Sequence, residues 1–137
     1  MERDLGRELR ERGIQTSAQR MAVAEYVLRT DAHPSADQVW VRVRARFPHI
    51  SRATVYNTLN LFVRKGLLRQ LVIAEGKVVF DPHVAAHHHF VDELTGAILD
   101  VPWEAVEVRR LEELKGLEVR DYQVVMRGRR SARPRRA

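Results

Sequence analysis

Apolar residues along the first half of the chain recur with the spacing of amphipathic helices. The clearest case lies between Ser51, a good N-cap residue, and Gly66, which suits the left-handed end of a helix. The apolar residues between them fall at i, i+4, i+7 and i+8 and form one stripe: Val55, Leu59, Phe62 and Val63. We therefore predict a helix over residues 51–65 with one buried face.

Three shorter helices are predicted before it, over residues 4–12, from about 17 to 30 and from about 36 to 47. The second and third follow the sequences T-S-A-Q and S-A-D-Q, which begin at Thr16 and Ser35. Each sequence fits a capping box, because the hydroxyl accepts the backbone N–H of the Gln and the Gln side chain reaches back. The sequence thus predicts four helices before residue 66.

The pattern changes after residue 66. Runs rich in Leu and β-branched residues over 67–73 and 78–81 flank the turn A-E-G-K, so we predict a β-hairpin. Helices that end in a two-stranded hairpin are typical of a winged helix-turn-helix, in which the last helix, here residues 51–65, reads DNA. We assign residues 1–82 to a winged-helix DNA-binding domain.

The second half of the chain is predicted to be built differently. Residues 87–93 and 97–101 read as two strands, followed by a helix over 104–114 and a strand over 119–127. The fold class is therefore α+β, with a winged helix followed by a small α/β (β-β-α-β) domain over residues 83–128. Such a domain is too small to bury a core comfortably, and its strand edges invite pairing with a second copy. We expect a dimerisation and metal-sensing domain, and a homodimer.

Charge supports this division into two functions. The net charge of the 137 residues is +6, but residues 1–66 carry +5, residues 67–128 carry −4 and residues 129–137 carry +5. A basic N-terminal half favours nucleic acid as a partner, and we expect residues 129–137 to be a disordered basic tail. No run approaches the roughly 20 apolar residues of a membrane span, so no membrane partner is expected. The absence of cysteine excludes disulfides and thiolate zinc sites and fits a cytoplasmic protein.

The polar face of the helix over residues 51–65 is the predicted DNA-binding surface. Asn, Arg and Tyr side chains can read base edges or hold phosphates, and a further arginine in the second helix can add a phosphate contact. The candidate DNA-binding residues are Arg20, Ser51, Arg52, Tyr56, Asn57 and Asn60. An ordinary amphipathic helix with a solvated face is the alternative reading.

Histidines and aspartates predict a metal site. His87 and His89 share one face of a strand, and Asp100 lies on the strand that returns beside it. Asp81 and His33 lie near the domain junction and can approach if the hairpin folds back. Three imidazoles and two carboxylates suit Fe²⁺, Mn²⁺, Co²⁺ or Zn²⁺. The alternative is a solvated His-His-His strand that binds metal only adventitiously.

Three segments carry a resemblance to the ferric-uptake-regulator (Fur) superfamily over roughly residues 5–128. They are T-S-A-Q-R, then A-H-P-S-A-D with F-P-H-I-S-R-A-T-V-Y-N-T-L, and finally H-x-H followed by G-x-x-x-D. The resemblance implies a homodimeric, metal-dependent transcriptional repressor of a palindromic double-stranded DNA operator. It also implies a regulatory metal that bridges the two domains, with ligands at His33, Asp81, His87, His89 and Asp100.

Within this family, Asp100 resembles the ligand of peroxide-sensing, PerR-like members, where iron-sensing members often have glutamate. The resemblance implies that Fe²⁺ at the site reacts with hydrogen peroxide, that His87 or His33 is oxidised, and that repression ends. One regulatory divalent ion per subunit is expected, Fe²⁺ or Mn²⁺ in function and Zn²⁺ possible in a crystal. Nothing is turned over, so we expect no enzyme, no catalytic residue and no small-molecule substrate.

The chain departs from the family at two sites. Asp92 and Thr95 stand where the family has a C-x-x-C pair, so a Cys₄ structural zinc is excluded. Ala86 and His88 stand where a second regulatory site needs a histidine and an acid, which leaves one metal site per subunit.

Three other functions remain open. An iron, manganese or zinc homeostasis repressor without a peroxide response has the same donors. An iron oxygenase needs only two histidines and one carboxylate, but five ligands leave little room for a substrate. A metal-storage or chaperone protein is distinguished by a lack of DNA affinity.

Overall fold

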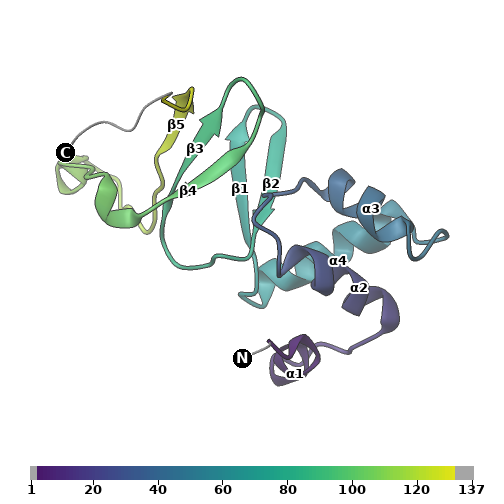
Figure 1. Ribbon diagram of the computed structural model, residues 1–137. Helices are drawn as coiled ribbons and strands as arrows, with labels where there is room; N and C mark the ends of the chain where they lie inside the picture. The colour runs from purple at the N-terminus through teal and green to yellow at the C-terminus, as the bar shows by residue number, and fades with distance from the viewer. Residues whose placement is uncertain (1–2, 132–137) are drawn as a thin grey trace. The chain divides into compact units, whose positions relative to one another are not determined.

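In the computed structural model, which describes residues 3–131, four α-helices fill the first half of the chain. They are α1 Leu5–Glu11, α2 Ala18–Val27, α3 Ala36–Arg44 and α4 Arg52–Arg64 (Figure 1). Each begins at a residue whose side-chain oxygen accepts a backbone N–H of the first turn, as expected for Asp and Ser N-caps. The four predicted helices are therefore present, each shorter at its end than the sequence pattern suggests.

The predicted N-cap of α2 is wrong by one residue. Ser17, not Thr16, has the extended backbone of an N-cap, and its hydroxyl accepts the N–H of Arg20 at 3.3 Å. Two adjacent hydroxyl residues offer the same capping chemistry, so the sequence does not choose between them. The capping box at Ser35 is present as predicted, with Gln38 Oε1 accepting the Ser35 N–H at 2.8 Å.

The apolar stripes meet in one core. From α4, Val55, Leu59 and Phe62 are fully buried, whereas Val63 is only partly buried at the margin. The remaining helices contribute their own stripes, which include Leu5, Leu9, Val23, Val27, Val39 and Val43. This packing leaves the polar face of α4 exposed, which is the face that a recognition helix presents to DNA.

A β-hairpin follows α4, with β1 at Arg69–Ala74 and β2 at Lys77–Asp81 in antiparallel pairing. Its turn is closed by Gly76 at φ +70°, a conformation that glycine adopts without steric cost. Leu71, Ile73, Val79 and Phe80 are buried. The N–H of Phe80 also donates to the carbonyl of Pro34 at 2.9 Å, which ties β2 to the loop before α3.

The chain divides between Val84 and Ala85 into two compact units, here called the N-terminal and the C-terminal unit. The C-terminal unit is a three-stranded sheet in the order β4-β3-β5 (Figure 1). β3 is His88–Asp92, β4 is Ile98–Val101 and β5 is Val125–Gly128. β3 pairs antiparallel with β4 and parallel with β5. The third strand is thus present, but it begins six residues later than predicted.

The prediction of a continuous helix over residues 104–114 is wrong. That segment holds two short 3₁₀ turns, Trp103–Ala105 and Leu111–Glu113, separated by non-helical chain. Val106 and Val108 are spaced by two, which places them on opposite sides of a helix and on one side of an extended chain. Arg110 also has a left-handed backbone, with φ +66°, which ends any helix there.

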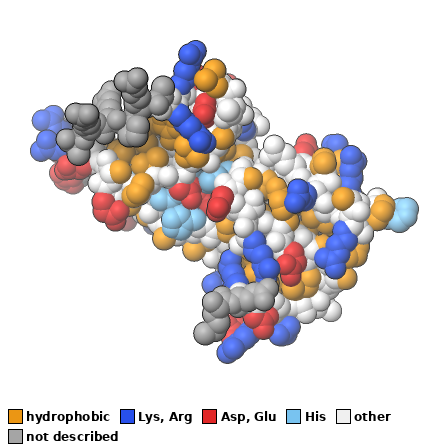
Figure 2. All heavy atoms as spheres, viewed as in Figure 1, with side chains coloured by type: hydrophobic (Ala, Val, Ile, Leu, Met, Phe, Trp, Pro, Cys, Tyr) orange, Lys and Arg blue, Asp and Glu red, His pale blue; other side chains and the backbone are white. Residues whose placement is uncertain are grey.

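The remaining expectations concern the tail and the membrane. Of the predicted tail over 129–137, residues 132–137 lie outside the described part of the chain. Within residues 3–131, no helix has both the length and the apolar character needed to cross a bilayer. On the N-terminal unit, Figure 2 shows several separate groups of Lys and Arg side chains on the face in view.

Candidate metal centre and DNA-binding face

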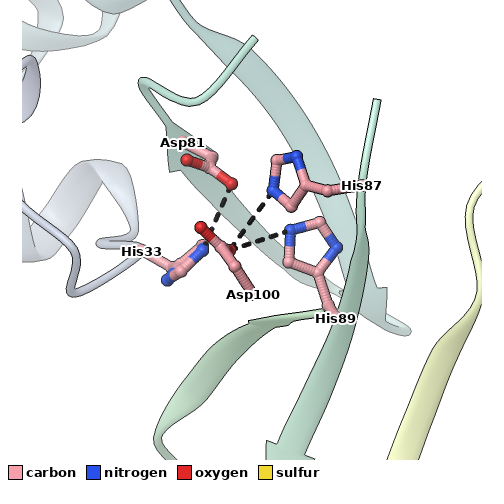
Figure 3. Close-up of side chains that lie close together, drawn as sticks. All are labelled: His33, Asp81, His87, His89 and Asp100. Carbon is pink, nitrogen blue, oxygen red and sulfur yellow. Dashed lines mark ion pairs between the residues drawn. The ribbon is translucent and has the colours of Figure 1, made fainter. Parts of the chain in front are cut away.

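The N-terminal unit supplies one imidazole and one carboxylate. His33 lies in the loop before α3 and Asp81 ends β2, and their Nε2 and Oδ2 atoms are 3.2 Å apart (Figure 3). Both side chains are buried, with 4% and 2% of their surfaces exposed. The Phe80-to-Pro34 hydrogen bond holds the two backbones together, and Asp81 Oδ1 accepts the N–H of His83 at 2.8 Å.

The backbone at His33 is unusual for a residue with a side chain. Its φ is +50°, in the left-handed region, and the next residue is Pro34, which disfavours helical conformations before it. Such strain persists only where the surroundings enforce it, and it is common at functional sites. The conformation turns the His33 imidazole toward Asp81 (Figure 3).

The C-terminal unit supplies two imidazoles and one carboxylate. His89 on β3 pairs directly across the ladder with Asp100 on β4. Asp100 Oδ1 lies 3.2 Å from His87 Nε2 and 3.6 Å from His89 Nε2, and both rings point toward that carboxylate (Figure 3). Both histidines are buried, whereas the Asp100 side chain is 38% exposed. The strand period of two therefore brings together the three residues that the sequence predicts on this face.

Hydrogen bonds fix which nitrogen of each imidazole is available. His87 Nδ1 lies 2.7 Å from the Ala85 carbonyl, which can only accept, so Nδ1 carries the proton. His89 Nδ1 lies 2.8 Å from Gln123 Oε1 and donates to it in the same way. Nε2 of each ring is directed to Asp100 and is the nitrogen that could bind a metal, as in metal sites in which an acceptor at Nδ1 orients the histidine.

His88 has the opposite tautomer and belongs to another environment. Its Nδ1 accepts the N–H of Val124 at 3.0 Å, so the proton of the neutral ring is on Nε2. The ring stacks on Trp103 with 4.6 Å between centroids. His88 is therefore a core residue on the other face of β3, as the period of two predicts.

The donors of each unit are of the kind that binds a divalent transition ion. The candidate ligands are His33, Asp81, His87, His89 and Asp100, two from the N-terminal unit and three from the C-terminal unit. Four of the five are buried, and neutral imidazole with carboxylate oxygen suits Fe²⁺, Mn²⁺, Co²⁺ and Zn²⁺. Asp100 is the one candidate ligand whose side chain is partly exposed.

Four of the six predicted DNA-binding residues line two hollows of the N-terminal unit. Arg20 and Asn57 line a cavity of about 440 Å³ between α2 and α4, together with Arg64. Tyr56 and Asn60 line a second cavity of about 460 Å³, which also reaches the hairpin at Lys77. Arg20 and Asn57 thus form one group of predicted DNA-binding residues, and Tyr56 and Asn60 form another.

Ser51 and Arg52 are placed differently. The Ser51 hydroxyl accepts the N–H of Thr54 at 3.0 Å and lies 2.8 Å from the Thr54 hydroxyl, so its main contact is the helix cap. The Arg52 guanidinium lies over the ring of Trp40, 4.5 Å from its centroid, instead of lining either cavity.

Sequence reasoning missed the groups that orient the ligands. Gln123 lies 34 positions from His89 and the Ala85 contact uses a backbone carbonyl, so neither has a local sequence signal. It also missed how the turn after β3 is held. Asp92 Oδ1 accepts the N–H of Leu94 at 2.9 Å and Thr95 Oγ1 accepts that of Ala97 at 3.1 Å. The hydrogen bonds of these two side chains therefore close the turn. Asp92 and Thr95 are also the two positions at which the resemblance to the family leads us to expect its first Cys pair.

Comparisons with known proteins show the family to which the chain belongs. The sequence profile of the ferric uptake regulator family matches residues 11–127. The chain is 33% identical over 122 residues to the peroxide operon regulator of Bacillus subtilis (strain 168), covering 88% of this chain and 84% of that protein.

Solved structures show the same fold. The ferric uptake regulator (Fur) of Vibrio cholerae matches with a TM-score of 0.71 at 23% identity, over 92% of this chain and 99% of that one. The ferric uptake regulator of Pseudomonas aeruginosa with manganese matches with a TM-score of 0.67 at 26% identity, over 91% and 96%. The predicted α+β fold class and the family resemblance are confirmed, and the chain belongs to the ferric uptake regulator family.

Proposed function

We propose that this chain is a metal-dependent, homodimeric transcriptional repressor in which one divalent ion joins the ligands of the two units. The observation that carries the proposal is the pair of imidazoles, His87 and His89, whose Nδ1 atoms are held by acceptors and whose Nε2 atoms are both directed to Asp100. First-row divalent ions take about four to six ligands, and neither unit supplies that number alone. His33 and Asp81 complete the set.

Joining the two units links metal binding to DNA binding. The five residues between Asp81 and His87 are the only covalent connection between the two ligand sets. With the ion bound, that connection is held at both ends, and in a dimer the two recognition helices α4 gain a fixed spacing. Each then enters a major groove of a palindromic operator, with half-sites about one helical turn apart. Coupling of this kind is typically about 1–3 kcal/mol, or several-fold to over a hundredfold in DNA affinity.

We further propose that the repressor responds to hydrogen peroxide. Support comes from the 33% identity to the peroxide operon regulator of Bacillus subtilis and from the partly exposed carboxylate of Asp100. Fe²⁺ held by these ligands would activate the O–O bond of peroxide, and the adjacent imidazoles of His87 and His33 are the oxidisable groups. One peroxide oxygen would be added to an imidazole carbon and the other would leave as water, so that the imidazole supplies the two electrons that peroxide takes up. An imidazole that gains an oxygen atom is a poorer donor, so the set loses a ligand and DNA is released. The chain acts once per oxidation, without turnover.

The test is intact-protein mass after a brief peroxide pulse, with Fe²⁺-loaded and Mn²⁺-loaded protein compared. We expect one added oxygen atom in the iron form only, located at His87 or His33 by peptide mapping, together with loss of DNA binding. The Mn²⁺ form is the matched control, because the same ligands then hold an ion that does not react with peroxide as Fe²⁺ does.

A second candidate is a metal-homeostasis repressor without a peroxide response. It is favoured by the likeness to the Pseudomonas aeruginosa ferric uptake regulator with manganese, since the donor set accepts the same ions. If neither loaded form is oxidised and DNA affinity follows the free metal concentration, this candidate replaces peroxide sensing. If the chain binds metal but no DNA under any condition, it is a metal-binding protein and both repressor proposals fail.

A further inference from the structure

Two arginines from different helices share one tryptophan ring in the N-terminal unit. The guanidinium carbon of Arg44, in the last turn of α3, is 4.3 Å from the centroid of Trp40. That of Arg52, at the start of α4, is 4.5 Å from the same centroid. The two cationic groups therefore lie less than about 9 Å apart, a separation comparable to the Debye length of about 8 Å at physiological salt.

The ring that they share is fixed in place. Trp40 is half-buried, and its indole N–H donates to the carbonyl of Ile50 at 3.0 Å. Ile50 immediately precedes Ser51, the N-cap of α4, so the indole joins α3 to the entry of the recognition helix. A guanidinium stacked on this ring loses much of its conformational freedom before any ligand arrives, while its N–H edges stay available.

This arrangement leaves positive charge without compensation. Neither Arg44 nor Arg52 forms an ion pair with an acidic side chain of residues 3–131, although both are exposed. Arg52 is the first residue of α4, whose first turn holds no acidic side chain, and a cation is disfavoured at that end by the helix dipole. The contacts with Trp40 hold the two guanidinium groups in place but do not neutralise their charge, whereas an external anion would balance it.

We propose that Trp40 is a positioning residue that holds Arg44 and Arg52 as a paired phosphate contact for the DNA backbone beside the recognition helix. This inference rests on the proposed DNA-binding function. A planar guanidinium can bind a phosphate through two N–H groups, and two of them kept at a fixed spacing bind with less loss of entropy than mobile side chains. Phosphate contacts set affinity and orientation and carry no base sequence. Trp40 therefore contributes to affinity for any duplex.

The experiment measures the affinity of the Mn²⁺-loaded full chain for a fluorescent random-sequence DNA duplex across a series of salt concentrations. Arg52→Gln and Arg44→Gln should each reduce the slope of log affinity against log salt by about 0.9, the value for one lost phosphate contact. Trp40→Leu should reduce the slope in the same direction although it removes no charge, and Trp40→Phe should retain part of it. Trp40→Leu added to the doubly substituted Arg44→Gln, Arg52→Gln protein should leave its affinity nearly unchanged, because both guanidinium groups that Trp40 positions are then absent.

Arg42→Gln is the matched control. It removes one positive charge from α3, the helix that also carries Trp40 and Arg44. The Arg42 guanidinium, however, lies over Tyr26, 5.3 Å from the centroid of that ring. The proposal is overturned if Arg42→Gln lowers the slope as much as Arg52→Gln, or if Trp40→Leu leaves it unchanged. It is also overturned if Trp40→Leu lowers the affinity of the Arg44→Gln, Arg52→Gln protein as much as it lowers that of the unsubstituted chain. Thermal melting checks that each variant folds, and Trp40→Phe serves if Trp40→Leu does not. An unsubstituted chain that binds no duplex refutes the proposed function itself.

Discussion

At the scale of single residues, His33 combines a ligand with a strained backbone, and substitutions can separate the two. His33→Ala and His33→Gly both remove the imidazole, so both should abolish metal-dependent DNA binding. Only glycine adopts φ +50° without steric cost, so His33→Gly should be more stable than His33→Ala by about 1 kcal/mol. The measurements are DNA affinity with and without Mn²⁺, and urea unfolding of the metal-free proteins.

Gel filtration of each His33 variant is the control. Both variants should elute as the same dimer as the unsubstituted chain, because the dimer should not depend on this side chain. Equal stabilities of the two variants would show that the left-handed backbone is not a property of the folded protein in solution. Unchanged metal-dependent DNA binding in either variant would refute the bridging ion.

Substitution of Gln123 tests whether the hydrogen bond at Nδ1 of His89 orients that ligand. Its Oε1 accepts the Nδ1–H of His89 at 2.8 Å and so fixes the Nε2 lone pair toward the metal side. Gln123→Leu removes the acceptor at similar volume, and we expect metal affinity to fall by about 10- to 100-fold, as is typical of such groups. Gln123→Glu keeps an acceptor at the same position and is the control. Calorimetric titration with Mn²⁺ gives both affinities, and equal binding by the Leu variant would contradict the assigned tautomer.

At the scale of secondary-structure elements, the turn between β3 and β4 is held by its own side chains. Asp92 is buried, accepts the N–H of Leu94 and pairs across the sheet with Gly128 of β5. Asp92→Ala leaves that N–H without its acceptor, so we expect a loss of about 1–2 kcal/mol in the free energy of unfolding. Urea denaturation of the metal-free protein measures it.

Asp92→Asn is the control for that turn. It keeps the oxygen that accepts from Leu94 and loses only the charge opposite Arg130, which is 3.5 Å away and well exposed. A surface pair of this kind contributes little, so the Asn variant should lie within about 0.5 kcal/mol of the unsubstituted chain. If Asn is as damaging as Ala, the ion pair and not the turn hydrogen bond stabilises this element.

The elements also show which parts of the structure a sequence pattern can predict. Helix α4 was predictable because its cap, stripe and terminal glycine all lie within 16 residues and agree with one another. The segment over residues 104–114 was not, because apolar residues at mixed spacing give no single face and the left-handed Arg110 has no sequence signature. The parallel pairing of β3 with β5 joins residues more than 30 positions apart, and local periodicity says nothing about such a pair.

Among the candidate ligands, too, some positions could be predicted from local sequence patterns and others could not. His87 and His89 were predictable from strand geometry, and their relation to Asp100 needed only a hairpin. The closeness of His33 to Asp81 depends on a backbone hydrogen bond between Phe80 and Pro34, which only the folded chain reveals. The stack of Arg52 on Trp40 joins two helices in the same way.

At the scale of the whole molecule, the proposed bridging ion acts on the segment that connects the two units. Residues 83–86 are exposed, and they lie between the buried ligands Asp81 and His87. A segment with few buried contacts opens readily, and clamping both of its ends restricts the excursions that a protease needs. Elastase cuts after small apolar residues, which this segment offers at Val84 and Ala85. We therefore expect Mn²⁺ to slow elastase cleavage at these positions by about fivefold or more, in line with the proposed coupling of about 1–3 kcal/mol.

The control for this whole-molecule effect is a chain that keeps one ligand set but cannot join it to the other. In His33→Gly the three ligands of the C-terminal unit remain, so Mn²⁺ can still bind weakly there but should no longer protect residues 84–85 from elastase. Cleavage sites and rates are read by mass spectrometry with and without the ion. Equal protection in His33→Gly would mean that Mn²⁺ stabilises the C-terminal unit alone, and the ion would then have no means of fixing the recognition helices relative to the dimer.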